Sequence, residues 1–212
     1  MTPIPTEHEP VDRQRVHKVL DWLEYGGDRK AALELLTRFH SWLATEAMAA
    51  GGIGPAETGR LWSRHIADSL TFMAGLRHPG AVVDVGSGVG LPGIPLAIAL
   101  PGVSFSLLDR SERRCDLADR AVRVLELKNV EVVQADYRQV TLPHDTAVSR
   151  AVAAPAAFAG ALRRLLPEGT SAVLGGSAGT TEPPRSGDIE ILRVPPDVLG
   201  KEAWLAKVSL SP

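Results

Sequence analysis

Hydrophobic positions in the N-terminal part of the chain recur every three or four residues, which is the spacing of amphipathic helices. This pattern runs through residues 11–25, 30–48 and 61–73, and each segment can bury one apolar face against a core. A Gly-Gly-Asp sequence ending at Asp28 separates the first two segments and supplies a side chain that can cap the second helix. We therefore expect residues 1–79 to form an N-terminal helical extension.

From residue 81 the pattern changes to short runs of β-branched residues that alternate with helical segments. The expected strands are 81–85, 103–108, 130–134, 146–150 and 170–174, and the expected helices are 92–99, 112–126 and 155–166. Such alternation is typical of a parallel sheet wrapped by crossover helices. Two later runs, 189–194 and 203–210, are joined by a link that suits an antiparallel pair better than a crossover. The sequence predicts a doubly wound, Rossmann-like α/β domain over residues 80–212, mostly parallel, with an antiparallel C-terminal hairpin.

The composition is that of an ordinary globular protein, with 44% hydrophobic and 23% charged residues. A single cysteine, Cys115, can form neither an intramolecular disulfide nor a zinc site with a second cysteine. The N-terminus lacks a basic segment followed by an apolar one, and no run of eighteen apolar residues occurs. We expect a cytoplasmic protein that does not span a membrane and needs no metal.

Net charge varies along the chain. The whole sequence has 23 Lys and Arg against 25 Asp and Glu, a formal charge of −2, whereas nucleic-acid-binding domains usually present basic surfaces. Residues 1–59 carry six basic against nine acidic residues, residues 60–164 thirteen against ten, and residues 165–212 four against six, which gives −3, +3 and −2. Random scatter over a solvated surface explains this division equally well. The charge therefore favours a shaped target or a non-RNA substrate over tight binding to bare RNA.

A glycine-rich loop after the first expected strand is the strongest chemical signal. The strand ends in Asp84 and continues through Gly86, Gly88 and Gly90 into a helix. Glycines let the backbone turn sharply and approach a ligand, and a helix start offers free N–H groups. Asp109 ends the second strand, nineteen residues after Gly90, where a carboxylate can accept hydrogen bonds from both ribose hydroxyls of an adenosine.

Two cofactors fit this loop. Gly88, Gly90 and Gly93 match the dinucleotide fingerprint, but such a match alone is weakly specific. In the dinucleotide pattern the first glycine follows the strand almost directly, and here that glycine is Gly86. When the fingerprint is counted from Gly86, its third glycine position falls on Leu91. This position of the glycines and the antiparallel end of the sheet favour S-adenosyl-L-methionine over a nicotinamide cofactor. Either cofactor is favoured over a glycine turn that is purely structural.

Several segments together resemble the small-subunit ribosomal RNA methyltransferase G family, also called glucose-inhibited division protein B. These segments are RLWSRHIADSL (60–70), VDVGSGVGLPGIPLAI (83–98), LLDRSERR (107–114), LELKNV (125–130) and VSRAVA (148–153). The resemblance extends from residue 60 to residue 153, about half the chain, and the combination of segments is far more specific than the glycine loop alone. The resemblance implies a class I S-adenosyl-L-methionine-dependent methyltransferase that modifies N7 of a guanosine in 16S rRNA, near the decoding site of the small ribosomal subunit.

The resemblance also implies roles for individual residues. Together with the loop it defines an expected cofactor-binding set of Asp84, Gly86, Ser87, Gly88, Gly90, Leu91, Asp109, Asp136, Tyr137, Arg138 and Arg150. Arg150, at the expected boundary between cofactor and guanine, is the candidate catalytic residue. The chain departs from the family in reading Asp136-Tyr137-Arg138 where Arg-Ala-Glu is usual, and Gly175-Gly176 where Lys-Gly is common. Asp136 can then accept from the adenine amino group, and RNA binding is expected to be weaker or different.

Candidate RNA ligands are Arg64, His65, Arg113 and Arg114. His65 can instead bond to Asp68 as an i, i+3 neighbour on a helix surface. The two adjacent arginines can instead form ion pairs with acidic residues of their own helix, namely Glu112, Asp116 and Asp119.

Two other functions stay open on the sequence. One is a methyltransferase of the same fold that acts on another RNA or a small molecule, suggested by the departures at residues 136–138 and 175–176. The other is a non-catalytic S-adenosyl-L-methionine-binding module, against which the intact glycine loop and Arg150 argue.

Overall fold

The computed structural model describes residues 9–150, 155–167, 169–176 and 188–210. Seven strands form its centre, namely β1 (Ala81–Val85), β2 (Ser104–Asp109), β3 (Val130–Gln134), β4 (Thr146–Arg150), β5 (Ser171–Gly176), β6 (Ile189–Val194) and β7 (Ala203–Ser209). The α-helices are α1 (Glu9–Trp22), α2 (Arg29–Trp42), α3 (Asp68–Leu70), α4 (Gly93–Ala99), α5 (Glu112–Leu125), α6 (Pro155–Leu165) and α7 (Pro196–Leu199).

All seven strands belong to one sheet, in the order β3-β2-β1-β4-β5-β7-β6. The first five pair in parallel, whereas β7 pairs antiparallel with both β5 and β6. This confirms the expected parallel sheet with an antiparallel C-terminal hairpin. The order reverses between β1 and β4, and ligands of open α/β sheets bind beyond the carboxyl ends of the strands at such a point.

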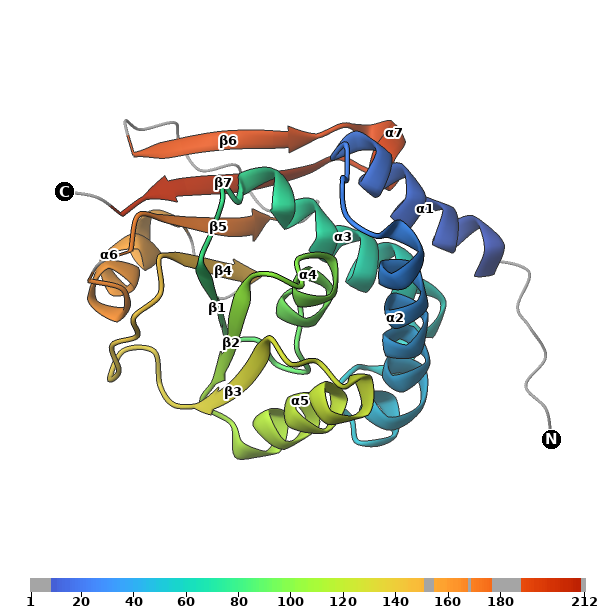
Figure 1. The fold of residues 1–212 in the computed structure, drawn as a ribbon, viewed down its shortest axis with the longest axis horizontal. Coiled ribbons are helices and arrows are strands. Elements are labelled where there is room, and N and C mark those ends of the chain that lie inside the picture. The colour runs from blue at the N-terminus through green and yellow to red at the C-terminus, as the bar shows by residue number, and fades with distance from the viewer. Residues whose placement is uncertain (1–8, 151–154, 168, 177–187, 211–212) are drawn as a thin grey trace.

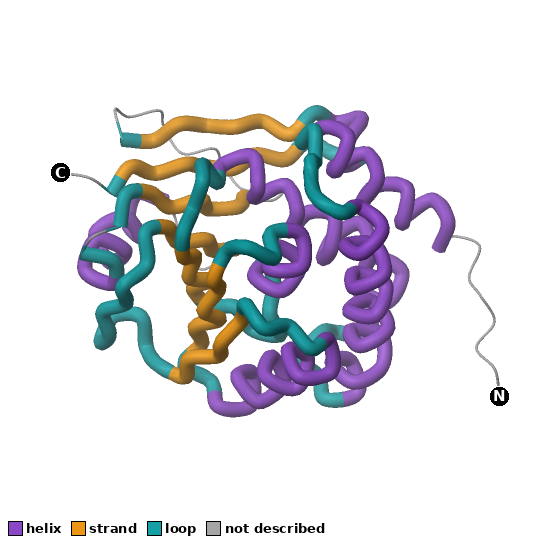
Figure 2. Tube along the Cα trace, in the orientation of Figure 1, coloured by secondary structure: helices purple, strands orange, loops and turns teal. Residues whose placement is uncertain are grey.

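Helices cover both faces of the sheet (Figures 1 and 2). Side chains alternate along each strand, so Phe105 and Leu107 of β2 face α4 and α5 while Leu108 belongs to the cluster that includes α6. In Figure 1, α2 lies outside α4 and α5. One buried cluster joins Leu36 of α2 to Ile94 of α4. The N-terminal helices thus share a core with the α/β part of the chain.

The expected helices of the N-terminal region are more irregular than their hydrophobic spacing predicts. The segment expected as one helix over 30–48 is α2 followed by a π-helical turn, η1 (Leu43–Ala47). The segment expected over 61–73 is a π-helix, η3 (Leu61–Ala67), then α3 and a 3₁₀ turn, η4 (Thr71–Gly75); another 3₁₀ turn, η2 (Pro55–Arg60), precedes it. The expectation of regular helices was therefore wrong here, because apolar spacing does not distinguish helical turns of different width.

The α/β elements lie within two residues of their expected bounds. Asp28 caps α2 as predicted, since its Oδ1 accepts from the Ala31 N–H at 3.0 Å. The short helix α7 was not expected in the link between β6 and β7. In the parts of the chain that the structure describes, no helix is long and apolar enough to cross a membrane.

Candidate functional site: two cavities that meet at Arg150

The glycine loop begins where β1 ends and crosses the end of β2. The Gly86 and Ser87 N–H groups donate to the Leu108 carbonyl at 2.7 and 3.1 Å. Gly86, Gly88 and Gly90 all have positive φ, at 75°, 58° and 92°, a region that side chains disfavour. The glycines are therefore required by the backbone path of the loop.

Asp84 supports this loop from inside the protein. Its side chain is fully buried, and its Oδ2 accepts from the Gly93 N–H at 2.7 Å, at the start of α4. Burial raises the pKa of the Asp84 carboxyl to about 7, against the lowering effects of the Gly93 hydrogen bond and of Arg150. Its Oδ1 is buried and has no hydrogen-bond partner among the described residues. This oxygen therefore has the capacity to accept one further hydrogen bond.

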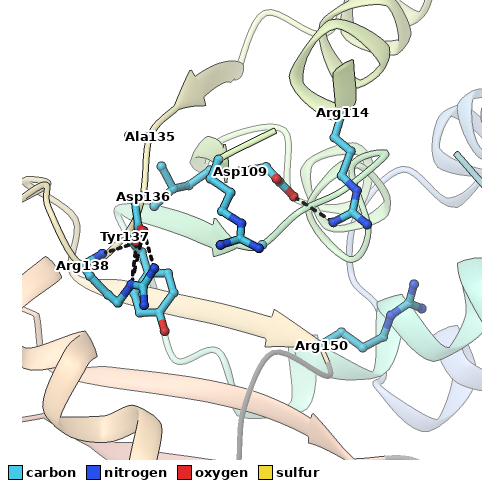
Figure 3. Close-up of a pocket in the computed structure, with 10 residues that line it drawn as sticks. Asp109, Arg114, Ala135, Asp136, Tyr137, Arg138 and Arg150 are labelled. Atoms are coloured by element: carbon cyan, nitrogen blue, oxygen red, sulfur yellow. Dashed lines mark hydrogen bonds and ion pairs between the residues drawn. The ribbon is translucent and has the colours of Figure 1, made fainter. Parts of the chain in front are cut away.

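Asp109 anchors the loop from β2. Its Oδ2 accepts from the Gly88 N–H at 3.1 Å, its Oδ1 accepts from the Ser111 N–H at 2.9 Å, and Arg114 Nη1 lies 3.7 Å from Oδ2. The carboxylate faces a cavity of about 390 Å³, called here the Asp109 cavity (Figure 3). It is lined by Gly86, Leu108, Asp109, Arg110, Arg114, Ala135, Asp136, Tyr137, Arg138 and Arg150.

Asp136, Tyr137 and Arg138 form the wall opposite Arg150 in Figure 3. Arg138 donates through Nε and Nη2 to Asp136, with a shortest contact of 2.5 Å, and its backbone N–H donates to the same carboxylate. These hydrogen bonds hold the pKa of Asp136 at about 2. The Tyr137 ring meets Phe158 edge to face, with centroids 5.2 Å apart. An adenine amino group would have to share Asp136 with Arg138.

Arg150, at the end of β4, has partners on both sides. Its Nη1 donates to the Arg64 carbonyl at 3.3 Å. Desolvation lowers the pKa of Arg150, whereas the carboxylates of Asp68 and Asp84 raise it. This half-buried cation lines the Asp109 cavity and also a second cavity on its other side.

The second cavity, called here the Arg64 cavity, measures about 470 Å³. It is lined by Arg15, Arg60, Ser63, Arg64, His65, Asp68, Arg150, Leu199, Gly200 and Lys201. These residues come from α1, η2, η3, α3, β4, α7 and the α7–β7 link. Of these residues, only Arg64, His65 and Arg150 were predicted from the sequence as site residues.

His65 is bonded to Glu57, and the expected alternative of a bond to Asp68 was wrong. Its Nε2 lies 3.1 Å from Glu57 Oε2, while Asp68 accepts instead from Lys201 Nζ at 2.5 Å. The i, i+3 rule fails because η3 is a π-helix, whose wider turn displaces the side chains. Desolvation and the neighbouring Arg150 lower the pKa of His65 to about 4, so the ring is neutral at pH 7.

The two arginines at the start of α5 are separated by the fold. Arg114 lines the Asp109 cavity, whereas Arg113 donates to the Ala50 carbonyl and lies at a different, shallower depression. The expected alternative of pairing within α5 was wrong for Arg114, whose ion pair is with Asp109. Asp119 pairs with Arg123 instead.

Several expected cofactor ligands lie behind the Asp109 cavity. Those that do not line it are Asp84, Ser87, Gly88, Gly90 and Leu91. Ser87 and Leu91 are buried, and the Leu91 and Gly90 N–H groups both donate to the Ser87 carbonyl. These residues shape the loop. The segment that follows Arg150, residues 151–154, lies outside the described residues, as does the Gly- and Pro-rich stretch 177–187.

The fold resembles that of a methyltransferase of known structure. The structure aligns with a crystal structure of a SAM-dependent methyltransferase from Aquifex aeolicus with a TM-score of 0.50 and 19% sequence identity, covering 74% of this chain and 94% of that one. With the sheet order and the loop after β1, this alignment defines the class I, Rossmann-like methyltransferase fold.

The sequence comparisons then give the family. The profile described as GidB, rRNA small subunit methyltransferase G, matches residues 32–183. Proteins named ribosomal RNA small subunit methyltransferase G share 44% identity over 143 residues in Leifsonia xyli subsp. xyli (66% of this chain, 63% of the relative) and 43% over 127 residues in Mycobacterium marinum (58% and 55%). The chain belongs to the rRNA small subunit methyltransferase G family. It spans less than two thirds of the length of these curated relatives.

Proposed function

We propose that this protein transfers a methyl group from S-adenosyl-L-methionine to N7 of a guanosine in 16S rRNA, within the small ribosomal subunit. Relatives at 43 and 44% identity carry the name of such an rRNA methyltransferase. The observation that carries the proposal is that Arg150 lines both the Asp109 cavity and the cation-rich Arg64 cavity. A cofactor on one side of Arg150 and an RNA nucleotide on the other would meet at this side chain.

The residues of the Asp109 cavity fit an adenosine-containing cofactor. Its volume, about 390 Å³, lies in the range of ligand pockets. Asp109 Oδ1 and Oδ2 are acceptors for ribose hydroxyls, and the Tyr137 ring and backbone N–H groups offer an adenine subsite. Asp84 does not line the cavity, but its Oδ2 accepts from the Gly93 N–H and would hold the glycine loop in place beside the cofactor. When bound, the cofactor would supply a methyl group on a sulfonium.

Methylation at N7 does not require the protein to remove a proton from the base. N7 of guanine carries a lone pair and no proton, so the new N–C bond can form as the S–C bond breaks without a general base. The protein would hold the two reactants in line and exclude water, which can contribute several kcal/mol. Arg150 would position the base from the β4 end, and Arg64 would contact the RNA.

The test uses purified protein with methyl-labelled S-adenosyl-L-methionine and three acceptors: small ribosomal subunits, protein-free 16S rRNA and a pool of small metabolites. We expect label at N7 of one guanosine of the rRNA. Label only in metabolites would assign the protein to another substrate class. Cofactor binding without transfer to any acceptor would indicate a binding module. Arg150→Ala should lower transfer at least about 100-fold in the same assay. Arg29→Gln serves as its control, because Arg29 pairs with Asp21 and lines neither cavity.

A further inference from the structure

The Arg64 cavity brings cations together from regions that are far apart in the sequence. Arg15 comes from α1, Arg60 and Arg64 from η2 and η3, and Lys201 from the link between α7 and β7. Arg150 adds a fifth positive charge at the border with the Asp109 cavity. Two of these residues lie in the terminal regions whose net charge is negative.

The acidic groups near this cavity do not balance its cations. Among the described residues, Asp68 is the one carboxylate that lines it, and its Oδ2 accepts from Lys201 Nζ at 2.5 Å. Glu57, behind the wall, is shared: its Oε1 lies 3.2 Å from Arg64 Nη1 and 3.9 Å from Arg60 Nη1, and its Oε2 faces His65. One carboxylate thus serves two arginines, whose side chains stay 52% and 60% exposed. Even without Arg15, the cations near these two carboxylates number four, so the described part of the cavity retains an excess of positive charge; they are Arg60, Arg64, Arg150 and Lys201.

The wall of the cavity has a defined shape because buried residues hold it. Val16 and Leu20 of α1 and Val198 and Leu199 of α7 belong to one buried cluster. The Arg15 guanidinium lies against Gly200, where an added Cβ would overlap Nη1. The positive charges are therefore presented on packed elements, as a preformed anion site requires.

We propose that the Arg64 cavity binds backbone phosphates of the RNA strand on either side of the methylated nucleotide, and that Arg15, Arg60 and Lys201 are positioning residues that act there with Arg64. This inference rests on the proposed function and deepens it. Guanidinium groups match phosphate oxygens with paired hydrogen bonds, and lysine binds phosphate as a point charge. Phosphate contacts set the register of the strand, so they would deliver one nucleotide to Arg150.

The experiment measures how salt affects the binding of protein-free 16S rRNA to the full-length protein. Each lost phosphate contact should lower the slope of log affinity against log salt by about 0.7 to 0.9. We expect Lys201→Gln and Arg15→Gln each to show this decrease and to raise the KM for RNA several-fold, with unchanged affinity for S-adenosyl-L-methionine. Arg29→Gln, which likewise removes a cation from an ion pair with an aspartate, should bind like the wild type. Thermal melts verify that each variant is folded.

Asp68→Asn separates a phosphate ligand from a simple structural pair. If Lys201 only holds Asp68, Asp68→Asn and Lys201→Gln will weaken RNA binding equally, and the inference is overturned. If Lys201 binds phosphate, Asp68→Asn should bind RNA at least as tightly as the wild type, because it frees the ammonium and removes a negative charge. This opposite response of the two variants supports the inference.

The result also separates the two proposals from each other. The phosphate site alone would be contradicted if the protein methylates rRNA but every cation variant keeps the wild-type salt slope and KM. The four variants are those at Arg15, Arg60, Arg64 and Lys201. A protein that transfers no methyl group to rRNA, yet loses salt dependence in these variants, would contradict the proposed function and support the phosphate site.

Discussion

The two cavities on either side of Arg150 are built in different ways. The Asp109 cavity is formed at the ends of parallel strands, where β1, β2, β3 and β4 release the chain into loops. The Arg64 cavity is formed between helices and the α7–β7 link, which meet through a shared core. The first is a mixture of acidic and basic groups, whereas the second is dominated by cations.

This difference shows how one side chain can join two kinds of recognition. Strand ends place a carboxylate and backbone N–H groups at defined positions, which suits a small cofactor with many polar groups. Helices from separate regions gather cations in one place, which suits a polyanion. In the proposed function, the strand ends would hold the cofactor and the helices would hold the RNA.

The largest expected effect follows from Arg150, because both cavities depend on it. Arg150→Ala removes a cation that lowers the pKa of both Asp84 and Asp68, although Asp68 keeps its contact with Lys201. Loss of one partner of a buried charge pair costs about 3 to 5 kcal/mol. We expect methyl transfer to fall at least about 100-fold and the melting temperature to decrease. Arg150→Lys retains the charge and should restore stability more than activity in single-turnover assays. Equal recovery of both would mean that Arg150 only holds the fold.

Asp109→Ala should affect one cavity and leave the other unchanged. The loss of charge-assisted hydrogen bonds predicts S-adenosyl-L-methionine binding weaker by about 1.5–3 kcal/mol, or roughly 10- to 100-fold. Titration calorimetry measures this affinity, and RNA affinity should not change. Asp119→Ala, on the same helix as Arg114 but paired with Arg123, is the control. An unchanged cofactor affinity would remove Asp109 from the site.

Two glycines of the loop region give a matched pair of stability tests. A Cβ at Gly93 would overlap Leu107 Cδ2 and lie 2.8 Å from Asp84 Oδ2, whereas one at Gly88 would have open space but a φ of 58°. We expect Gly93→Ala to lose about 1–3 kcal/mol by overpacking, and Gly88→Ala about 1 kcal/mol from backbone strain. Denaturant unfolding measures both. The reverse order would contradict the packing at Asp84.

The last effect is absent at neutral pH and develops only in acid, and it arises in the Arg64 cavity. Because the pKa of His65 is lowered from 6.5 to about 4, the unfolded chain binds more protons between these values. The stability that neutral His65 contributes is present above pH 6.5 and is lost as the pH falls toward 4. Relative to His65→Gln, the wild type should lose up to about 3 kcal/mol of unfolding free energy over this range.

The pH dependence of stability that Asp84 contributes has the opposite sign, so the measurement must cancel it. Its pKa is raised to about 7, so its contribution to stability is present at low pH and is lost as the pH rises from about 4 to 7. Asp84 is common to the wild type and to His65→Gln, so the difference between the two proteins isolates the histidine. A difference that does not vary with pH would show that His65 titrates normally.

The α/β part of the chain was predictable because its signals are local. Runs of β-branched residues, the glycine phase after β1 and the aspartate at the end of β2 each lie within one short segment. Strand ends of a parallel sheet meet at one edge, so Gly86, Asp109, Asp136 and Arg150 could be expected to converge, and all four line one cavity. The turns η1, η3 and η4 were missed because their hydrophobic spacing also fits a regular α-helix.

The sheet, the glycine loop and the family resemblance could be predicted from the amino-acid sequence, because they depend on the order of residues within short segments. Which charges act together follows from the fold. Arg15 and Lys201 lie 186 positions apart, in regions of negative net charge, yet both line the Arg64 cavity. Counting charges along the chain cannot show this, because electrostatic interactions depend on distance in space. Burial of the apolar faces of α1 and α7 in a common core brings these cations to Arg150.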